Sequence, residues 1–266
     1  MDKQHFFKYF SQQFLSILIT VLVGVGMFPS LAVRAEKSSS QEKTRVSVAF
    51  QPPPGQGMPN RTAGGASRTG NSCGRLSSDK SDLTALVPAL QKPNAIGPSL
   101  TGLTTEANPT FYFYLPATAA TEGVFSLKDE NEQDLYQTRL SVAGKTGIIS
   151  VKLPSDTPAL KIGQSYRWSF GLICPSQSSQ QPPEVIFVTG EIRRVEADAA
   201  VSEQLQQLTP VEQAAVYAEN GIWFNSVEIL ANLRQTQPND SMLASMWEEL
   251  LKSVELQEIA KQPFIN

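Results

Sequence analysis

Residues 160–174, LKIGQSYRWSFGLIC, contain the pattern that decides the fold. From Tyr166 to Cys174 every second residue is a large apolar side chain or the cysteine, which is the period of a β-strand with one buried face. Arg167, Ser169 and Gly171, which lie between them, are polar or small. The stretch predicts a strand that buries Trp168 and brings Cys174 to the edge of the core.

A shorter motif stands just ahead of this strand. Leu160-x-x-Gly163-x-x-Tyr166 is similar to the tyrosine corner of immunoglobulin-like and fibronectin type III sandwiches, where a tyrosine near the start of a strand bonds to upstream backbone. The resemblance implies structural roles for Leu160, Gly163, Tyr166 and Trp168. The alternative is a chance spacing of Leu, Gly and Tyr in another kind of sandwich.

Short β-rich runs follow one another through residues 83–197, separated by Asn, Asp, Gly, Pro and Ser. Regular strands without helical patterns between them are typical of an antiparallel sandwich. We therefore expect a mainly β protein, an Ig-like or fibronectin III-like antiparallel β-sandwich followed by three to four short α-helices. The runs besides 165–174 are Thr110–Leu115, Val124–Asp129, Leu135–Leu140, Ile148–Leu153 and Glu184–Val195.

The apolar period becomes helical in residues 198–266. Thr209-Pro210-Val211-Glu212 has the form of a capping box with proline at the first helical position, so a helix should begin there and end at Gly221. A second helix should run to Pro238. A third carries an apolar stripe from Leu243 to Val254.

Tyr217–Trp223, together with Pro238, resembles the second half of a tetratricopeptide repeat. A stacked array needs at least about three repeats, and we find a single one in this sequence. The stretch therefore predicts a helical hairpin packed on the sandwich or on itself. Its groove is a candidate for peptide binding, and Trp223 is a candidate partner-binding residue.

Residues 36–82 are rich in Ser, Gly and Pro and poor in large apolar side chains, which predicts a flexible arm. Within the arm, residues 45–50 alternate in polarity and predict a short edge strand. Arg61, Arg68 and Arg75 are candidates for contact with an anionic partner such as a wall polymer. Solubility alone is the alternative explanation for these arginines.

The first 35 residues have the form of a secretory signal. A positively charged start precedes the apolar run Phe14–Phe28, which is shorter than the ~20 residues that cross a bilayer, and cleavage is expected between Ala35 and Glu36. Cleavage would place the protein outside the cytoplasm, in the periplasm, secreted or at the cell surface. The alternative is an uncleaved anchor, the one case in which we expect membrane contact.

Loss of the signal changes the chemistry available to the rest of the chain. Without Lys3, Lys8 and Arg34 the 22 basic residues become 19, and without Asp2 the 25 acidic residues become 24. His5, the single histidine, is lost as well. The absence of imidazole excludes most familiar hydrolase and zinc-site designs, and the acidic balance argues against nucleic acid as a partner. No cofactor is expected.

Cys73 and Cys174 are the two cysteines, 101 residues apart. In an oxidising compartment an even count favours one disulfide, which would tie the arm to the domain core. Two unrelated buried thiols are the alternative.

Several fragments imitate catalytic or ion-binding motifs. Ser77-Ser78-Asp79-Lys80 and Lys145-Thr146-Gly147 match two motifs of penicillin-interacting serine enzymes, but the element between them is missing. Gly65–Ser72 has the glycine spacing of a phosphate-binding loop, with Asn71 where a lysine is required. Asp129–Asp134 could offer oxygen ligands to calcium, but a charged hairpin tip is favoured. We therefore predict no catalytic, cofactor or metal site.

Seven stretches, taken in order, point to a family. They are Gly64–Arg68 with Cys73, Leu83–Pro88, Pro109–Phe111, Gly147–Ser150, Tyr166–Trp168 with Cys174, Tyr217–Glu219 with Gly221–Trp223, and the tail from Trp247 to Ile259. Together they resemble the domain-of-unknown-function family numbered 928. The resemblance implies an exported protein, mainly of cyanobacteria, and no established activity. Members more often carry Asp-Ala where this chain has Asn225-Ser226, so no fixed acidic function is implied there.

These observations predict an exported, non-enzymatic protein that binds an envelope protein or a wall or surface polymer. The prediction rests on the lack of histidine, zinc ligands and a nucleophile–base pair, together with two domain types that usually recognise partners. A serine–lysine hydrolase or penicillin-interacting enzyme is one alternative. A purely structural envelope component is the other.

Overall fold

The computed structural model describes residues 46–59, 73, 82–91, 98–176 and 183–265. The chain divides into two compact units, Met1–Lys43 and Thr44–Asn266, and the described residues all belong to the second. Within them, no helix combines the length and the apolar character that crossing a membrane requires.

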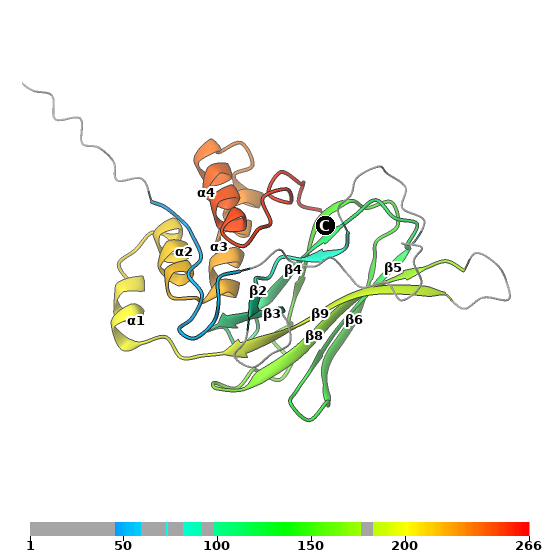
Figure 1. The fold of residues 1–266 in the computed structure, drawn as a ribbon, viewed down its shortest axis with the longest axis horizontal. Coiled ribbons are helices and arrows are strands. Elements are labelled where there is room, and N and C mark those ends of the chain that lie inside the picture. The colour runs from blue at the N-terminus through cyan, green and yellow to red at the C-terminus, as the bar shows by residue number, and fades with distance from the viewer. Residues whose placement is uncertain (1–45, 60–72, 74–81, 92–97, 177–182, 266) are drawn as a thin grey trace, which may run out of the picture. The chain divides into compact units, whose positions relative to one another are not determined.

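Nine strands form two sheets (Figure 1). The smaller sheet has the order β1–β4–β7, and the larger has the order β2–β3–β9–β8–β5–β6. All pairs are antiparallel except β3 with β9, which is parallel. The strands are β1 (Thr84–Ala85), β2 (Ala89–Gln91), β3 (Pro98–Thr104), β4 (Thr110–Leu115), β5 (Glu122–Lys128), β6 (Asp134–Ser141), β7 (Gly147–Lys152), β8 (Ser165–Cys174) and β9 (Glu184–Arg194).

This pairing is the arrangement of an Ig-like sandwich. β4 and β7 take the places of strands B and E, whereas β5, β8 and β9 take those of C, F and G. The aromatic rings of the two sheets meet in the core: Phe113 of β4 stacks on Phe170 of β8 with centroids 4.4 Å apart, and Phe111 lies 4.9 Å from Phe125 of β5. The predicted fold class, a sandwich followed by short helices, is confirmed.

Four helices follow the sandwich. Thr209 and Glu212 form the predicted capping box at the start of α2, and Gly221, with φ +72°, lies in the turn before α3. Asp240 caps α4 by accepting hydrogen bonds from the first backbone N–H groups. The helices are α1 (Ala199–Leu205), α2 (Pro210–Glu219), α3 (Trp223–Thr236) and α4 (Ser241–Lys252).

The central strand of the small sheet, β4, is buried on both faces, since all six of its residues are buried. On the face away from the core, the Thr110 hydroxyl donates to Glu228 of α3 (2.7 Å). The C-terminal tail pairs with the free edge of β7, where Ile148 N–H donates to the Pro263 carbonyl (2.7 Å). Helix α3 therefore contacts the small sheet from one side, and the tail extends its edge.

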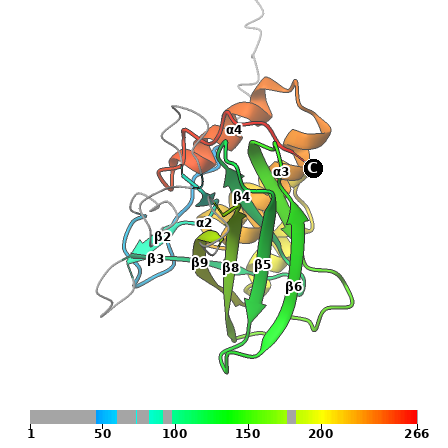
Figure 2. The ribbon, with the colours of Figure 1, turned by 90° about the vertical axis from the view of Figure 1, so that its right-hand side faces the viewer.

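The large sheet is packed on one face only. Along β5 buried and partly exposed residues alternate, as expected for a strand with one face in the core. The helices gather beside β2, β3 and β4, away from β5 and β6 (Figure 1). Figure 2 shows β9, β8, β5 and β6 lying side by side. The outer face of these strands is the one that the helices leave open.

The edge strand predicted for residues 45–50 is wrong. In the described part, 46–50, the backbone is irregular and pairs with no strand. Its N–H groups bond instead to helical residues: Phe50 N–H to the Ser253 hydroxyl (3.0 Å) and Gln51 N–H to the Ala218 carbonyl (3.0 Å). The residues do alternate between buried and exposed, but the buried ones pack against helices and not within a sheet.

Candidate binding surface on the six-stranded sheet

The pairing of β5, β8 and β9 determines which side chains face outward. Phe125, Phe170 and Val188 are paired and buried, so the residues on either side of them point away from the core. Two outward rows result, Glu122–Ile173–Val185 and Val124–Gly171–Phe187.

Four of these outward residues form an aliphatic and aromatic patch, which we call the outer patch: Val124, Ile173, Val185 and Phe187. Val185 is 47 % exposed, and the other three are partly exposed. Gly171 lies between them and is covered by its neighbours, because a Cβ there would lie in ordinary contact, 3.4 Å, with Val185. A cluster of exposed apolar side chains on a sheet face is typical of interaction sites.

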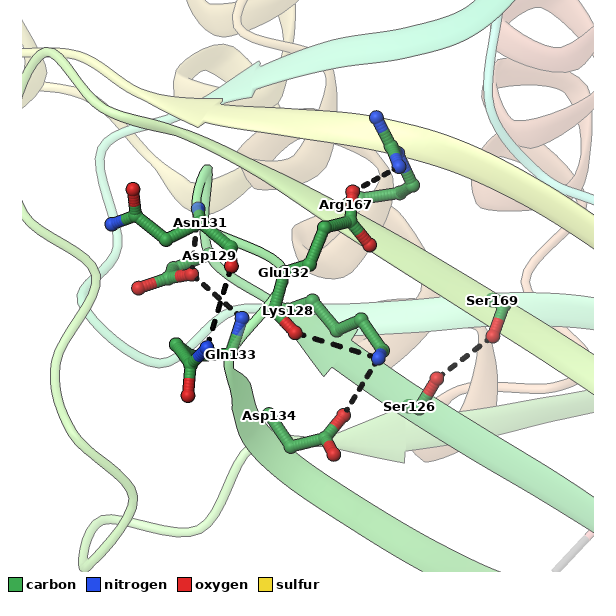
Figure 3. A network of polar contacts seen from close by, with 9 residues as sticks. All are labelled: Ser126, Lys128, Asp129, Asn131, Glu132, Gln133, Asp134, Arg167 and Ser169. Carbon is green, nitrogen blue, oxygen red and sulfur yellow. Dashed lines mark hydrogen bonds and ion pairs between the residues drawn. The ribbon is translucent and has the colours of Figure 1, made fainter.

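Polar and charged side chains continue along β5 and β8 beyond the outer patch, and Figure 3 shows them. The hydroxyls of Ser126 and Ser169 share a hydrogen bond across β5 and β8 (2.8 Å). Lys128 pairs with Asp134 at 3.3 Å, and Arg167 pairs with Glu132. The positive groups of this network therefore have acidic partners, and the network presents no uncompensated positive charge.

The acidic run 129–134 is the tip of the β5–β6 hairpin. Asp129 Oδ1 accepts hydrogen bonds from the backbone N–H of Asn131 (2.8 Å) and of Gln133 (2.9 Å) (Figure 3). One carboxylate oxygen thus orders the turn in the manner of an Asx turn. The preferred interpretation, a charged hairpin tip, agrees with this geometry.

The predicted tyrosine-corner bond is present. The Tyr166 hydroxyl accepts a hydrogen bond from Lys161 N–H (2.8 Å) and donates one to Gln164 Oε1 (3.1 Å). Gly163 has φ +81° in the turn between them, and Leu160 is fully buried. The motif fixes the entry into β8, whose outward residues form the centre of the candidate surface.

Tyr166→Phe is expected to lower the free energy of unfolding by about 0.5–1.5 kcal/mol, because the partly buried hydrogen bond from Lys161 N–H is lost. Urea unfolding followed by circular dichroism measures the change. The matched control is Tyr136→Phe in the same sheet, whose hydroxyl makes no hydrogen bond recorded among the described residues, and we expect a change within about 0.5 kcal/mol. Equal effects of the two substitutions would contradict the structural role of the corner.

Cys73 and Cys174 lie close enough together for the predicted disulfide. Their Cα atoms are 5.3 Å apart, within the range of protein disulfides, and both residues are buried. The Cys73 carbonyl also accepts hydrogen bonds from Ala119 N–H (3.1 Å) and the Thr118 hydroxyl (3.3 Å). Cys73 is thereby held at the C-terminal end of β8.

One sequence candidate for partner binding is contradicted. Trp223 is fully buried, and its indole N–H donates to the Leu86 carbonyl (2.8 Å), so it presents nothing to a partner. Packing of α3 on the sandwich gives this tryptophan a core role. Other predicted positions lie outside the described residues: Ala35, Glu36, Arg61, Arg68, Arg75, Ser77 and Lys80.

Two polar clusters around α3 have structural partners. Asn225 Oδ1 accepts hydrogen bonds from Thr105 N–H (3.0 Å) and the Thr104 hydroxyl (3.1 Å), which ties α3 to the end of β3. Burial raises the pKa of Tyr112, and the nearby charge of Glu228 raises it further, so this phenol stays neutral. Both clusters join α3 to the sandwich.

A comparison with protein families gives a match over most of the chain. The model described as Domain of Unknown Function (DUF928) matches residues 63–264. The chain belongs to the DUF928 family. Its DUF928 region takes in both cysteines, the tyrosine corner, the outer patch and all four helices.

The comparisons with curated proteins and with solved structures give no information about the function of the DUF928 protein. No curated protein matches this chain. Among solved structures, the β-glucuronidase of Parabacteroides merdae matches with 9% identity and a TM-score of 0.25, covering 62% of this chain. The chain spans about a quarter of that enzyme's length, with 27% covered. A likeness this weak carries no argument about the DUF928 protein.

The outer patch of the DUF928 protein was not predicted as a site. Val185 and Phe187 belong to a run that alternates, and alternation shows that a strand has two different faces. The apolar character of the second face could have been noticed from Ile173, Val185 and Phe187. Their meeting on one surface depends on the pairing of β8 with β9.

Proposed function

We propose that this DUF928 protein is an exported, non-enzymatic protein that binds another protein of the cell envelope through the outer patch. The observation that carries the proposal is the exposure of Val185 beside Phe187 and Ile173 on the sheet face that the helices leave open. Export is supported by the sequence of residues 1–35 and by cleavage expected between Ala35 and Glu36.

The chemistry of the face favours a protein over a polymer. Binding of a sugar polymer usually uses several exposed aromatic faces. Trp168, Trp223 and Trp247 are all buried, and the outer patch offers a single aromatic ring, the partly exposed Phe187. An anionic polymer would require unpaired positive charge, whereas Arg167 and Lys128 have acidic partners. Apolar side chains surrounded by polar groups are the usual composition of a protein–protein interface.

An envelope pull-down with single-residue variants tests the proposal. The tagged protein carries a photoreactive amino acid at Thr189, an exposed residue one row from the patch, so that a bound partner is cross-linked. Val185→Asp places a charge in the apolar contact and should reduce the cross-linked partner at least tenfold. Met242→Asp is the matched control, because Met242 is similarly exposed (52 %) at the start of α4.

Two results would contradict the proposal. One is equal cross-linking by the Val185→Asp protein and the unmodified protein, with circular dichroism showing both folded. The other is retention of a glycan without any cross-linked protein, which would favour the polymer alternative.

A further inference from the structure

The segment Ser47–Pro53, which we call the strap, lies against three helices. In Figure 1 it is the blue segment beside α2 and α3. Alternate strap residues are buried: Val48 is 0% and Phe50 is 1% exposed, whereas Ser47 and Gln51 are exposed. This is the way in which an extended peptide lies in a groove, with every second side chain inserted.

Phe50 is the main anchor of the strap. Its ring meets the edge of Trp223 in a T-shaped contact with centroids 5.3 Å apart. Burial of an aromatic and a β-branched side chain contributes several kcal/mol, about 1.5–3 kcal/mol for each. The tryptophan that the sequence offered for partner binding thus forms the floor of an occupied groove.

The helices also bind the strap backbone. Ser253 at the C-terminal end of α4 and Ala218 in the last turn of α2 accept hydrogen bonds from two successive strap N–H groups, those of Phe50 and Gln51 (3.0 Å each). The Ser47 hydroxyl donates to Glu249 Oε1 (2.5 Å). A peptide in this groove is therefore held by hydrogen bonds to acceptors at two helix ends.

A tight turn connects the strap to the rest of the domain. Gln56 N–H donates to the Pro53 carbonyl (3.1 Å), and Gly55 has φ +82° with nothing within 4 Å of its Cβ position. Three consecutive prolines, 52–54, favour an extended chain if this turn opens.

We propose that the groove formed by α2, α3 and α4 also receives the strap of a second copy of this chain, so that two copies pair by exchanging straps. Both copies then keep the contacts of Val48 and Phe50, and the exchange costs only the opening of the turn at Gly55. We choose a second copy as the occupant because the strap sequence is the one that fits the groove in this structure, and every copy of the chain carries that strap. Exchange of an identical element is an established low-cost route to dimers.

Shortening the turn tests the exchange directly. Deletion of Pro54 and Gly55 in the full chain prevents the strap from folding back into its own groove, so light scattering should show a doubling of molecular mass with the circular dichroism spectrum retained. The matched control inserts four Gly and Ser residues after Gly55, and this protein should remain mainly monomeric. Adding Phe50→Asp to the deletion should abolish the dimer.

A second measurement uses the unshortened chain, so that the exchange can be tested even if the shortened variants do not fold. Isotopically heavy and light copies, each with a photoreactive amino acid at Ser47, are mixed, incubated at high concentration and irradiated. Cross-links between a heavy strap and a light α4 support the exchange. Heavy–heavy and light–light links alone would overturn it, as would a monomeric deletion variant or a dimer that survives Phe50→Asp.

Discussion

Replacing Gly190 with alanine is expected to destabilise the protein strongly. A Cβ at Gly190 would lie 2.2 Å from Cζ2 of Trp168 and 2.7 Å from the carbonyl oxygen of Leu100. Trp168 is fully buried between the sheets, and Leu100 contributes backbone, so neither can move aside without a shift of the core. Overpacking of this kind costs about 1–3 kcal/mol, and the backbone obstacle puts Gly190→Ala at or above the upper end.

Gly171→Ala is the matched control for this prediction. Gly171 lies in the neighbouring strand, and its added Cβ would meet Val185 at 3.4 Å, an ordinary contact. We expect a change in the free energy of unfolding within about 0.5 kcal/mol. Urea unfolding of both variants measures the difference, and equal stabilities would show that Trp168 is not confined as the structure places it.

Loss of the Cys73–Cys174 bond is expected to have the other large effect. The chain-entropy estimate for a loop of this length is about 4.7 kcal/mol, reduced by any strain in the native state. The double variant Cys73→Ala, Cys174→Ala should therefore unfold at a lower urea concentration than the oxidised protein. Its free energy of unfolding should be smaller by an amount that approaches this value. Urea unfolding with and without a reducing agent measures it.

The double variant is also the control, because a reducing agent should leave its unfolding curve unchanged. Thiol counting under denaturing conditions gives an independent result. Two free thiols in protein isolated from its oxidising compartment would contradict the disulfide.

Local pattern was enough to predict several elements. The alternation from Tyr166 to Cys174 determines which face of β8 is buried, because successive side chains of a strand must point to opposite sides. The capping box at Thr209 satisfies its own helix end with residues three positions apart. The tyrosine corner is likewise closed by neighbours within the same few residues.

Other features could not be predicted because their partners are distant in sequence. Residues 46–50 have the alternation of a strand, yet Phe50 bonds to Ser253, 203 residues away, and only the packing of α4 on α3 provides that acceptor. The sequence around Trp223 predicts an exposed groove residue. Trp223 is buried because Leu86 and Phe50, which are distant in sequence, contact it. Gly190 shows no signal of its own beyond being glycine in a strand.

The sequence by itself determined the strands β4 to β9, the helices α2 to α4, the buried face of β8, the capped start of α2 and the family to which the chain belongs. It did not show β1 to β3 or α1. The tertiary structure decided which strands are covered on both faces, where the outer patch lies and what occupies the helical groove. The physical reason is the distance along the chain over which each interaction acts. Hydrogen bonds within a turn and the two-residue period act over a few residues, whereas burial of a particular face depends on surfaces that meet only when distant segments pack together.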